Sequence, residues 1–116
     1  MVGEMCHRVP REEIFRHTGI QFMQINTAPQ LVAAAINDEF TEAKTFFMIP
    51  DLVNFKLTGK KFNERTDAST SQLYDPANRR WATELIERLG IPSDIFLNFI
   101  DAGQELGPLL PEVAEA

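Results

Sequence analysis

Prolines and glycines divide this sequence of 116 residues into short segments, and their spacing limits how long any helix can be. Pro10 precedes acidic residues and the segment ends at Gly19, which predicts a helix over residues 10–18 because proline suits a helix start and glycine a helix end. Pro50 and Gly59 bound a second segment of the same kind. We therefore expect several short helices rather than a few long ones.

Two further helices are expected between these segments. Thr27 and Gln30 form the Thr-x-x-Gln pattern of a capping box, which predicts a helix from Ala28 to about Ile36. A short helix over residues 40–48 is expected to end before Pro50, because a residue that precedes proline is pushed out of the helical region.

The second half of the chain is expected to continue in short helices. Asp67 is predicted to cap a helix over residues 68–73, and Asp75-Pro76 marks a turn before a longer helix over residues 81–89. No convincing strand pattern occurs before the tail. From Asp101 onward, glycine and proline recur, which predicts an irregular tail. The fold class expected for this segment is mainly α.

Composition excludes several functional classes. With 11 basic and 17 acidic residues the net charge is −6, which disfavours binding to a nucleic-acid backbone. The longest apolar run, residues 46–49, is far too short to span a membrane, and the first residues lack the pattern of a signal peptide. A lone cysteine, Cys6, is typical of a reducing compartment, so a cytoplasmic location is expected.

A search for chemical motifs finds no catalytic set. The six glycines are scattered and form no phosphate-binding loop. His7 and His17 have no partners at metal-ligand spacing, and Cys6 beside His7 is a poor arrangement for a nucleophile and its base. No catalytic residue, metal site or cofactor site is therefore predicted. The aromatic residues between 40 and 62 could line a ligand groove, but their helical spacing favours core packing.

Short motifs link the sequence to a known family. They are Thr18-Gly19-Ile20-Gln21-Phe22 followed by Asn26-Thr27, then Leu57-Thr58-Gly59, then Asp67-Ala68-Ser69-Thr70. The Leu-Thr-Gly and Asp-Ala-Ser-Thr motifs resemble those of the FGGY carbohydrate kinases, and the Thr-Gly-Ile-Gln-Phe motif with Asn-Thr is similar to the rhamnulokinase branch of that family. The order and spacing match across almost the whole chain.

This resemblance implies that residues 1–116 form part of the N-terminal domain of a two-domain α/β kinase with an actin-like, ribonuclease H-like fold. The parent enzyme would transfer the γ-phosphate of ATP, with Mg²⁺, to a ketose, with L-rhamnulose as the expected sugar in rhamnose catabolism. In the family, the phosphate loops and the catalytic aspartate lie outside the matched region. The chain is therefore expected to be inactive alone, as an excised segment, a truncated reading frame or a gene remnant.

The resemblance also implies a wall of the sugar pocket in the loop after Thr-Gly. Amide and hydroxyl groups suit a polyol, so Gln21, Asn26 and Thr27 are the candidate sugar-binding residues. The competing interpretation is that Thr27 caps a helix with Gln30, that Asn26 satisfies a turn and that Gln21 faces solvent. Where the family pattern has Leu-Tyr after Asn-Thr, this chain has Ala28-Pro29, which changes the packing near the pocket.

Two hypotheses about function remain open. The first is a ketose-kinase segment that contacts a ketose weakly, if at all. The second is a stand-alone helical module that binds a partner or itself through exposed apolar faces, because uncovered apolar surface promotes self-association. The two hypotheses differ in their expected responses to a sugar and to protein concentration.

Overall fold

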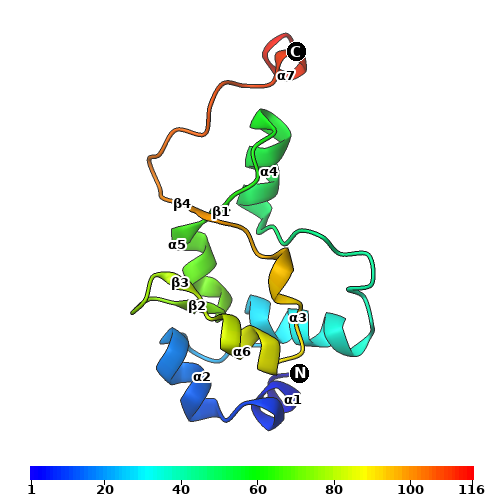
Figure 1. The fold of residues 1–116 in the computed structure, drawn as a ribbon, viewed down its shortest axis with the longest axis vertical. Coiled ribbons are helices and arrows are strands. Elements are labelled where there is room, and N and C mark those ends of the chain that lie inside the picture. Colours follow the sequence, from blue (N-terminus) through cyan, green and yellow to red (C-terminus); the bar gives the residue numbers. More distant parts are fainter.

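The computed structural model describes residues 1–116 and consists mainly of short helices joined by irregular segments (Figure 1). The α-helices are α1 (Val2–Arg8), α2 (Arg11–Thr18), α3 (Thr27–Ile36), α4 (Ile49–Thr58), α5 (Arg65–Ala68), α6 (Thr83–Arg88) and α7 (Pro111–Ala114). Short 3₁₀ helices cover Ser69–Ser71 and Ser93–Ile95. No helix has both the length and the apolar character that crossing a bilayer requires.

Four strands of two residues each form two separate pairs. Strands β2 (Tyr74–Asp75) and β3 (Arg80–Trp81) pair antiparallel as a hairpin. Strands β1 (Asn63–Glu64) and β4 (Phe99–Ile100) pair in parallel, with Asn63 opposite Phe99. Sequence analysis predicted none of these strands, because two residues are too few to show an alternating pattern.

The hydrophobic core lies between the N-terminal helices, α3 and α6. The fully or almost fully buried apolar side chains include Met5, Val9, Ile14, Val32, Leu73, Ile86 and Leu89. An aromatic cluster adjoins this core, with the Trp81 ring at centroid distances of 4.7 Å from Phe96 and 4.9 Å from Phe99. The core therefore unites residues from both halves of the chain.

Helix α1 was not predicted from the sequence, yet it closes one end of the core. Met5 is fully buried, and the Arg8 side chain donates from Nη1 to the backbone oxygen of Leu89 at 2.8 Å. This bond satisfies a carbonyl at the C-terminal end of α6, where the helix has no internal donor for it. The N-terminal residues are thus held by contacts from residues more than 80 positions away.

The molecule is elongated rather than round. Its principal extents are 50 × 31 × 22 Å and its radius of gyration is 15.3 Å, whereas a compact chain of this length has about 13 Å. Figure 1 shows why: α4 and the C-terminal segment project from the end opposite α1 and α2. The projecting part exposes the apolar side chains of Ile49, Leu52, Val53, Leu57 and Leu109.

Two predicted helices have their expected ends. Helix α2 covers residues 11–18 and stops at Gly19, and α4 stops at Gly59. Both glycines adopt left-handed backbone angles, with φ of 67° and 75°. Only glycine reaches this region without steric strain, which is why the two positions end helices reliably.

The helix predicted over residues 40–48 is wrong. Residues 37–42 form turns and residues 43–48 have no regular secondary structure. The Phe46 N–H donates to the backbone oxygen of Ile95 at 2.8 Å, and the Phe46 oxygen accepts from Asn63 Nδ2 at 3.0 Å. These bonds to distant residues replace the local helical bonds, and Phe46 is buried through them.

Two capping predictions and one helix boundary are also wrong in detail. Helix α3 begins at Thr27 with Asn26 at its N-cap, and no side chain caps it, so Thr27 and Gln30 form no capping box. Helix α5 begins before Asp67, because Glu64 takes the N-cap position. Trp81 lies in strand β3 rather than in a helix, and α6 begins only at Thr83.

Candidate functional site

The loop from Gly19 to Thr27 holds the three candidate sugar-binding residues. Asn26 donates from Nδ2 to the backbone oxygen of Gln21 at 2.7 Å, and Gln30 donates from Nε2 to the backbone oxygen of Ile25 at 2.8 Å. Two side-chain amides therefore close the loop on itself. A loop fixed in this way presents its remaining polar groups in a defined orientation.

The structure places the three candidates in different surroundings. The Gln21 side chain lines an open hollow of about 400 Å³ together with Arg11, Phe15 and Phe22. Thr27 lines a second hollow of about 360 Å³, where its Oγ1 lies 3.5 Å from the sulfur of Met48. The structure thus brings Asn26 and Gln21 together, whereas Thr27 faces another hollow.

A third hollow was missed by sequence reasoning. It has a volume of about 410 Å³ and lies between the end of α2, the β2–β3 hairpin and α6. Its polar lining residues are His17, Asp75, Asn78, Arg80, Thr83, Glu84 and Glu87. These residues come from three separate elements at no motif spacing, so the sequence gives no signal for this hollow.

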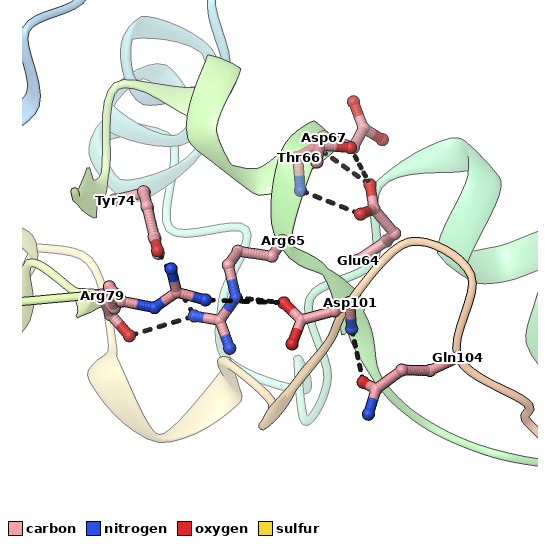
Figure 2. A network of polar contacts seen from close by, with 8 residues as sticks. All are labelled: Glu64, Arg65, Thr66, Asp67, Tyr74, Arg79, Asp101 and Gln104. Atoms are coloured by element: carbon pink, nitrogen blue, oxygen red, sulfur yellow. Dashed lines mark hydrogen bonds and ion pairs between the residues drawn. The ribbon is translucent and has the colours of Figure 1, made fainter.

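A polar network joins three distant parts of the chain (Figure 2). Arg65 donates from Nε to Asp101 Oδ1 at 2.5 Å and from Nη1 to the Arg79 backbone oxygen at 3.1 Å. The same guanidinium lies 3.3 Å from the Tyr74 hydroxyl and 4.8 Å from the Phe99 ring centroid. Arg65 therefore links the start of α5, the β2–β3 hairpin and the segment after β4.

Both ends of this network are anchored on the backbone. Glu64 accepts from the N–H groups of Thr66 and Asp67, each at 2.9 Å, and so caps α5. At the other end, the Asp101 N–H donates to Gln104 Oε1 at 2.7 Å. The network gives the chain after β4 a fixed exit direction.

Charge pairing shifts the pKa values of two members of the network. The hydrogen bond from Arg65 lowers the pKa of Asp101 below its ordinary value, and the same bond raises the pKa of Arg65. Asp101 therefore stays ionised to lower pH than a free aspartate does. The network contributes stability above the pKa that Asp101 has in the unfolded chain, and this contribution is lost as the pH falls through the folded pKa.

Replacing Arg65 with alanine is expected to raise the pKa of Asp101 toward that of a free aspartate. The change removes the bond that lowers it, and ¹³C NMR of the Asp101 carboxyl as a function of pH measures the result. Arg79→Ala is the matched control, because Arg79 lies 4.0 Å from the same oxygen and should produce a smaller shift. Equal shifts in the two variants would contradict this assignment.

The pKa of Asp67 is shifted in the opposite direction to that of Asp101. Burial, followed by the nearby carboxylates of Asp51 and Glu64, raises its pKa, and its Oδ2 is buried without a hydrogen-bond partner. The cause is geometric: Asp67 lies three residues after the N-cap, where a side chain usually accepts from the N-cap N–H. Here Asp51 Oδ1 accepts from the Glu64 N–H at 2.9 Å instead. Asp67 is thus left without its usual partner.

Asp67→Asn is expected to remove a pH dependence of stability. Because the folded pKa is raised, the wild-type chain loses stability as the pH rises above the ordinary aspartate value of about 3.9 and through the folded pKa. The variant has no charge to desolvate there and should not show this loss. Urea midpoints between acidic and neutral pH measure it, with Asp94→Asn as a control that removes an exposed charge. A wild-type midpoint that rises over this range relative to Asp67→Asn would disprove the expectation.

No group of three or more His, Cys, Asp or Glu side chains is placed to hold a metal ion. The guanidinium of Arg65 is already paired with Asp101, so it offers no free charge for phosphate.

Solved structures of sugar kinases contain the same fold. The chain superposes on the ligand-bound xylulose kinase from Lactobacillus acidophilus with a TM-score of 0.87 at 21% identity, covering 98% of this chain and 24% of that one. The xylulose kinase from Rhodospirillum rubrum gives a TM-score of 0.87 at 22% identity, with the same coverage. The fold is therefore that of one segment of a sugar kinase.

Sequence comparison gives the family. The model of the N-terminal domain of the FGGY family of carbohydrate kinases matches residues 2–116. The rhamnulokinase of Oceanobacillus iheyensis is 40% identical over 99% of this chain, and that of Halalkalibacterium halodurans is 41% identical over the same share. The chain belongs to the FGGY family of carbohydrate kinases. It spans about a quarter of the length of these two relatives.

Proposed function

We propose that this chain is a segment of an ATP-dependent ketose kinase whose sugar is L-rhamnulose, and that the segment alone has no kinase activity. The observation that carries the proposal is the identity of 40–41% over 99% of the chain with relatives named rhamnulokinase. The parent reaction transfers the γ-phosphate of ATP to a sugar hydroxyl in rhamnose catabolism. We place it in the cytoplasm, in keeping with the lone, unpaired Cys6.

The contribution of this segment would be to orient the sugar. Phosphoryl transfer depends mainly on positioning and on electrostatic stabilisation of the transferred group. Gln21 and Asn26, whose loop is closed by the Asn26–Gln21 hydrogen bond, are proposed to contact the sugar. Thr27 is proposed as a third contact, although it lines a separate hollow. ATP and Mg²⁺ are proposed to bind in the part of a full-length kinase that this chain does not span.

An amide NMR titration tests the proposal. L-Rhamnulose is expected to shift resonances between Gln21 and Gln30 weakly, and Mg-ATP is expected to shift none. L-Rhamnose, the isomeric aldose, is the control ligand and should give smaller shifts. Thr27→Val keeps the side-chain shape and removes the hydroxyl, so it should reduce the response if Thr27 contacts the sugar. Saturable shifts with Mg-ATP, or no difference between ketose and aldose, would contradict the proposal.

The second candidate function is a stand-alone helical module that assembles with itself or a partner. The observation that favours it is the exposure of apolar side chains on α4, where Val53 is 50% exposed and Ile49 is 73% exposed. A module of this kind would show an assembly state that depends on protein concentration. The kinase-segment proposal instead predicts a response to the sugar, so sedimentation and titration together separate the two.

A further inference from the structure

Gln72 is the largest of the fully buried polar side chains, with 0% exposure. Its Nε2 donates to the backbone oxygen of Ile20 at 3.4 Å, whereas its Oε1 has no hydrogen-bond partner. Its backbone is left-handed, with a φ of 67°. A buried acceptor without a donor and a left-handed backbone at a residue other than glycine both cost free energy. Packing alone therefore does not account for a glutamine at this position.

The hydrogen bond from Gln72 joins two segments that lie 52 positions apart in the sequence. Gln72 follows the 3₁₀ helix Ser69–Ser71, and Ile20 lies at the start of the loop that holds the candidate sugar-binding residues. Gln72 Nε2 is the one protein donor to the Ile20 oxygen. The Ile20 N–H donates to Thr18 Oγ1 at 3.4 Å, and that hydroxyl donates to the Ile14 oxygen at 2.9 Å. The start of the loop is thus tied both to the end of α2 and to the core.

Two side-chain amides hold the peptide groups on either side of Gln21. The oxygen of Ile20 belongs to the peptide before Gln21, and Gln72 holds it. The oxygen of Gln21 belongs to the peptide after it, and Asn26 Nδ2 donates to that oxygen at 2.7 Å. Because peptide groups are planar, only the torsions φ and ψ of Gln21 lie between the two. Holding both peptide groups therefore fixes the backbone of Gln21 and the direction in which its side chain leaves it.

The bond from Gln72 also decides which way the backbone N–H of Gln21 points. In a trans peptide the carbonyl oxygen and the N–H point in opposite directions. Because Gln72 is buried and Gln21 is exposed, the Ile20 oxygen faces the core and the Gln21 N–H faces away from it. No protein acceptor takes this N–H. It is therefore a hydrogen-bond donor of fixed direction, on the same loop as the side chains of Gln21 and Asn26.

We propose that Gln72 is a positioning residue, which aims the backbone N–H of Gln21 at a hydroxyl oxygen of the bound sugar. This inference rests on the proposed sugar-binding role of the loop from Gln21 to Thr27. Gln72 does not touch the sugar itself, since it is fully buried, and it acts through the Ile20 carbonyl. A hydroxyl oxygen accepts hydrogen bonds as well as donating one, so it suits a fixed N–H. Holding this donor in place beforehand removes the cost of ordering it when the sugar binds.

Gln72→Met tests the proposal without any ligand. Methionine is an unbranched side chain of similar volume that has no N–H to donate. Because the change also removes the unpaired Oε1, the thermal midpoint should fall by no more than about 5 °C. The Gln21 N–H belongs to the peptide that Gln72 holds, so its ¹⁵N order parameter reports this contact directly. We expect the order parameter to fall from about 0.85, the value of rigid backbone, to below about 0.6 in the variant.

Ser71→Ala is the matched control, because Ser71 is the neighbour of Gln72 and is equally buried. Ser71 Oγ donates to the Ala68 oxygen at 2.6 Å and accepts from the Leu73 N–H at 3.1 Å, so its bonds do not reach the loop. The control should lower the thermal midpoint but leave the order parameter of Gln21 within about 0.1 of the wild-type value. Equal loosening of Gln21 in both variants would overturn the proposal, because the loop would then respond to stability alone. So would an unchanged order parameter in Gln72→Met.

Gln72→Asn covers the case in which Gln72→Met does not fold. Asparagine adopts the left-handed backbone more readily than most other residues, which favours folding. Its amide is one methylene shorter and does not reach the Ile20 oxygen. The Gln21 N–H should therefore loosen in this variant as well, and a Gln21 that stays rigid would overturn the proposal.

Titration with L-rhamnulose separates this inference from the proposed function. The sugar should shift the Gln21 N–H proton of the wild-type chain, and its Kd should rise at least about threefold in Gln72→Met, because fewer molecules hold the competent loop. An unchanged Kd would overturn the positioning role. If L-rhamnulose shifts no resonance of the wild-type chain, the proposed sugar fails, and the order parameter of Gln21 decides whether Gln72 holds this peptide.

Discussion

Asp51→Ala is expected to destabilise the chain more than any other single change of a polar residue. The buried carboxylate accepts from the Met48 N–H at 3.1 Å, from Asn63 Nδ2 at 2.9 Å and from the Glu64 N–H at 2.9 Å. Removing it leaves these donors without an acceptor, at a cost of about 3–5 kcal/mol. Since small domains have a total stability of about 5–15 kcal/mol, a large fraction would be lost.

Urea denaturation followed by circular dichroism measures this loss. Asp51→Asn is the informative second variant, because it keeps the shape of the side chain but turns an amide nitrogen toward hydrogen-bond donors. It should lower the free energy of unfolding by about 2–4 kcal/mol. Glu115→Ala, an exposed acid near the C-terminus, is the control and should stay within about 0.5 kcal/mol of wild type. A loss below about 1 kcal/mol for Asp51→Ala would mean that water replaces the carboxylate.

Trp81→Ala is expected to cause the second large loss of stability. The indole packs edge-on against Phe46 at 6.1 Å between centroids, contacts Phe96 and Phe99, and donates from Nε1 to the Leu97 oxygen at 2.9 Å. Truncating a buried aromatic side chain of this size costs about 3–5 kcal/mol, since the cavity closes only partly. The aromatic cluster joins the β2–β3 hairpin to the segment before β4, so both should loosen together.

Trp81→Phe separates packing from hydrogen bonding. It keeps an aromatic ring at the centre of the cluster and removes the indole donor, so a loss of about 1–2 kcal/mol is expected. The same denaturation measurement applies to both variants. If Trp81→Phe destabilised the chain as much as Trp81→Ala, the Leu97 hydrogen bond rather than the aromatic packing would hold this region.

The helices that end at a glycine could be predicted from the sequence. The segments whose structure depends on contacts with distant residues could not. Gly19 and Gly59 end their helices through a local backbone preference. The segment around Phe46 has helical spacing, yet its backbone bonds go to Ile95 and Asn63, which lie far along the chain. Local patterns carry no information about such partners.

The candidate site shows the same division. The family motifs predicted sugar-binding residues in the loop from Gln21 to Thr27. In the structure, the Asn26 amide closes that loop. The Arg65–Asp101 pair, by contrast, joins residues 36 positions apart and has no motif. Asp67 was expected to cap a helix, but the helix begins earlier and Glu64 caps it. Asp51 accepts from the Glu64 N–H, so Asp67 lacks the partner that an acid at its position usually has.

The parallel pairing of β1 with β4 has a consequence for how the chain is made. Asn63 accepts the Leu97 N–H at 2.9 Å and pairs with Phe99, so these bonds cannot form until residues 97–99 have been synthesised. At about 5–20 residues per second, that delay lasts about 2–7 seconds. During this interval Asn63 Nδ2 can donate to Asp51 and to the Phe46 oxygen, whereas Asn63 Oδ1 and the backbone of β1 still lack their partners. The β1 segment therefore reaches its final structure only after β4 has been synthesised.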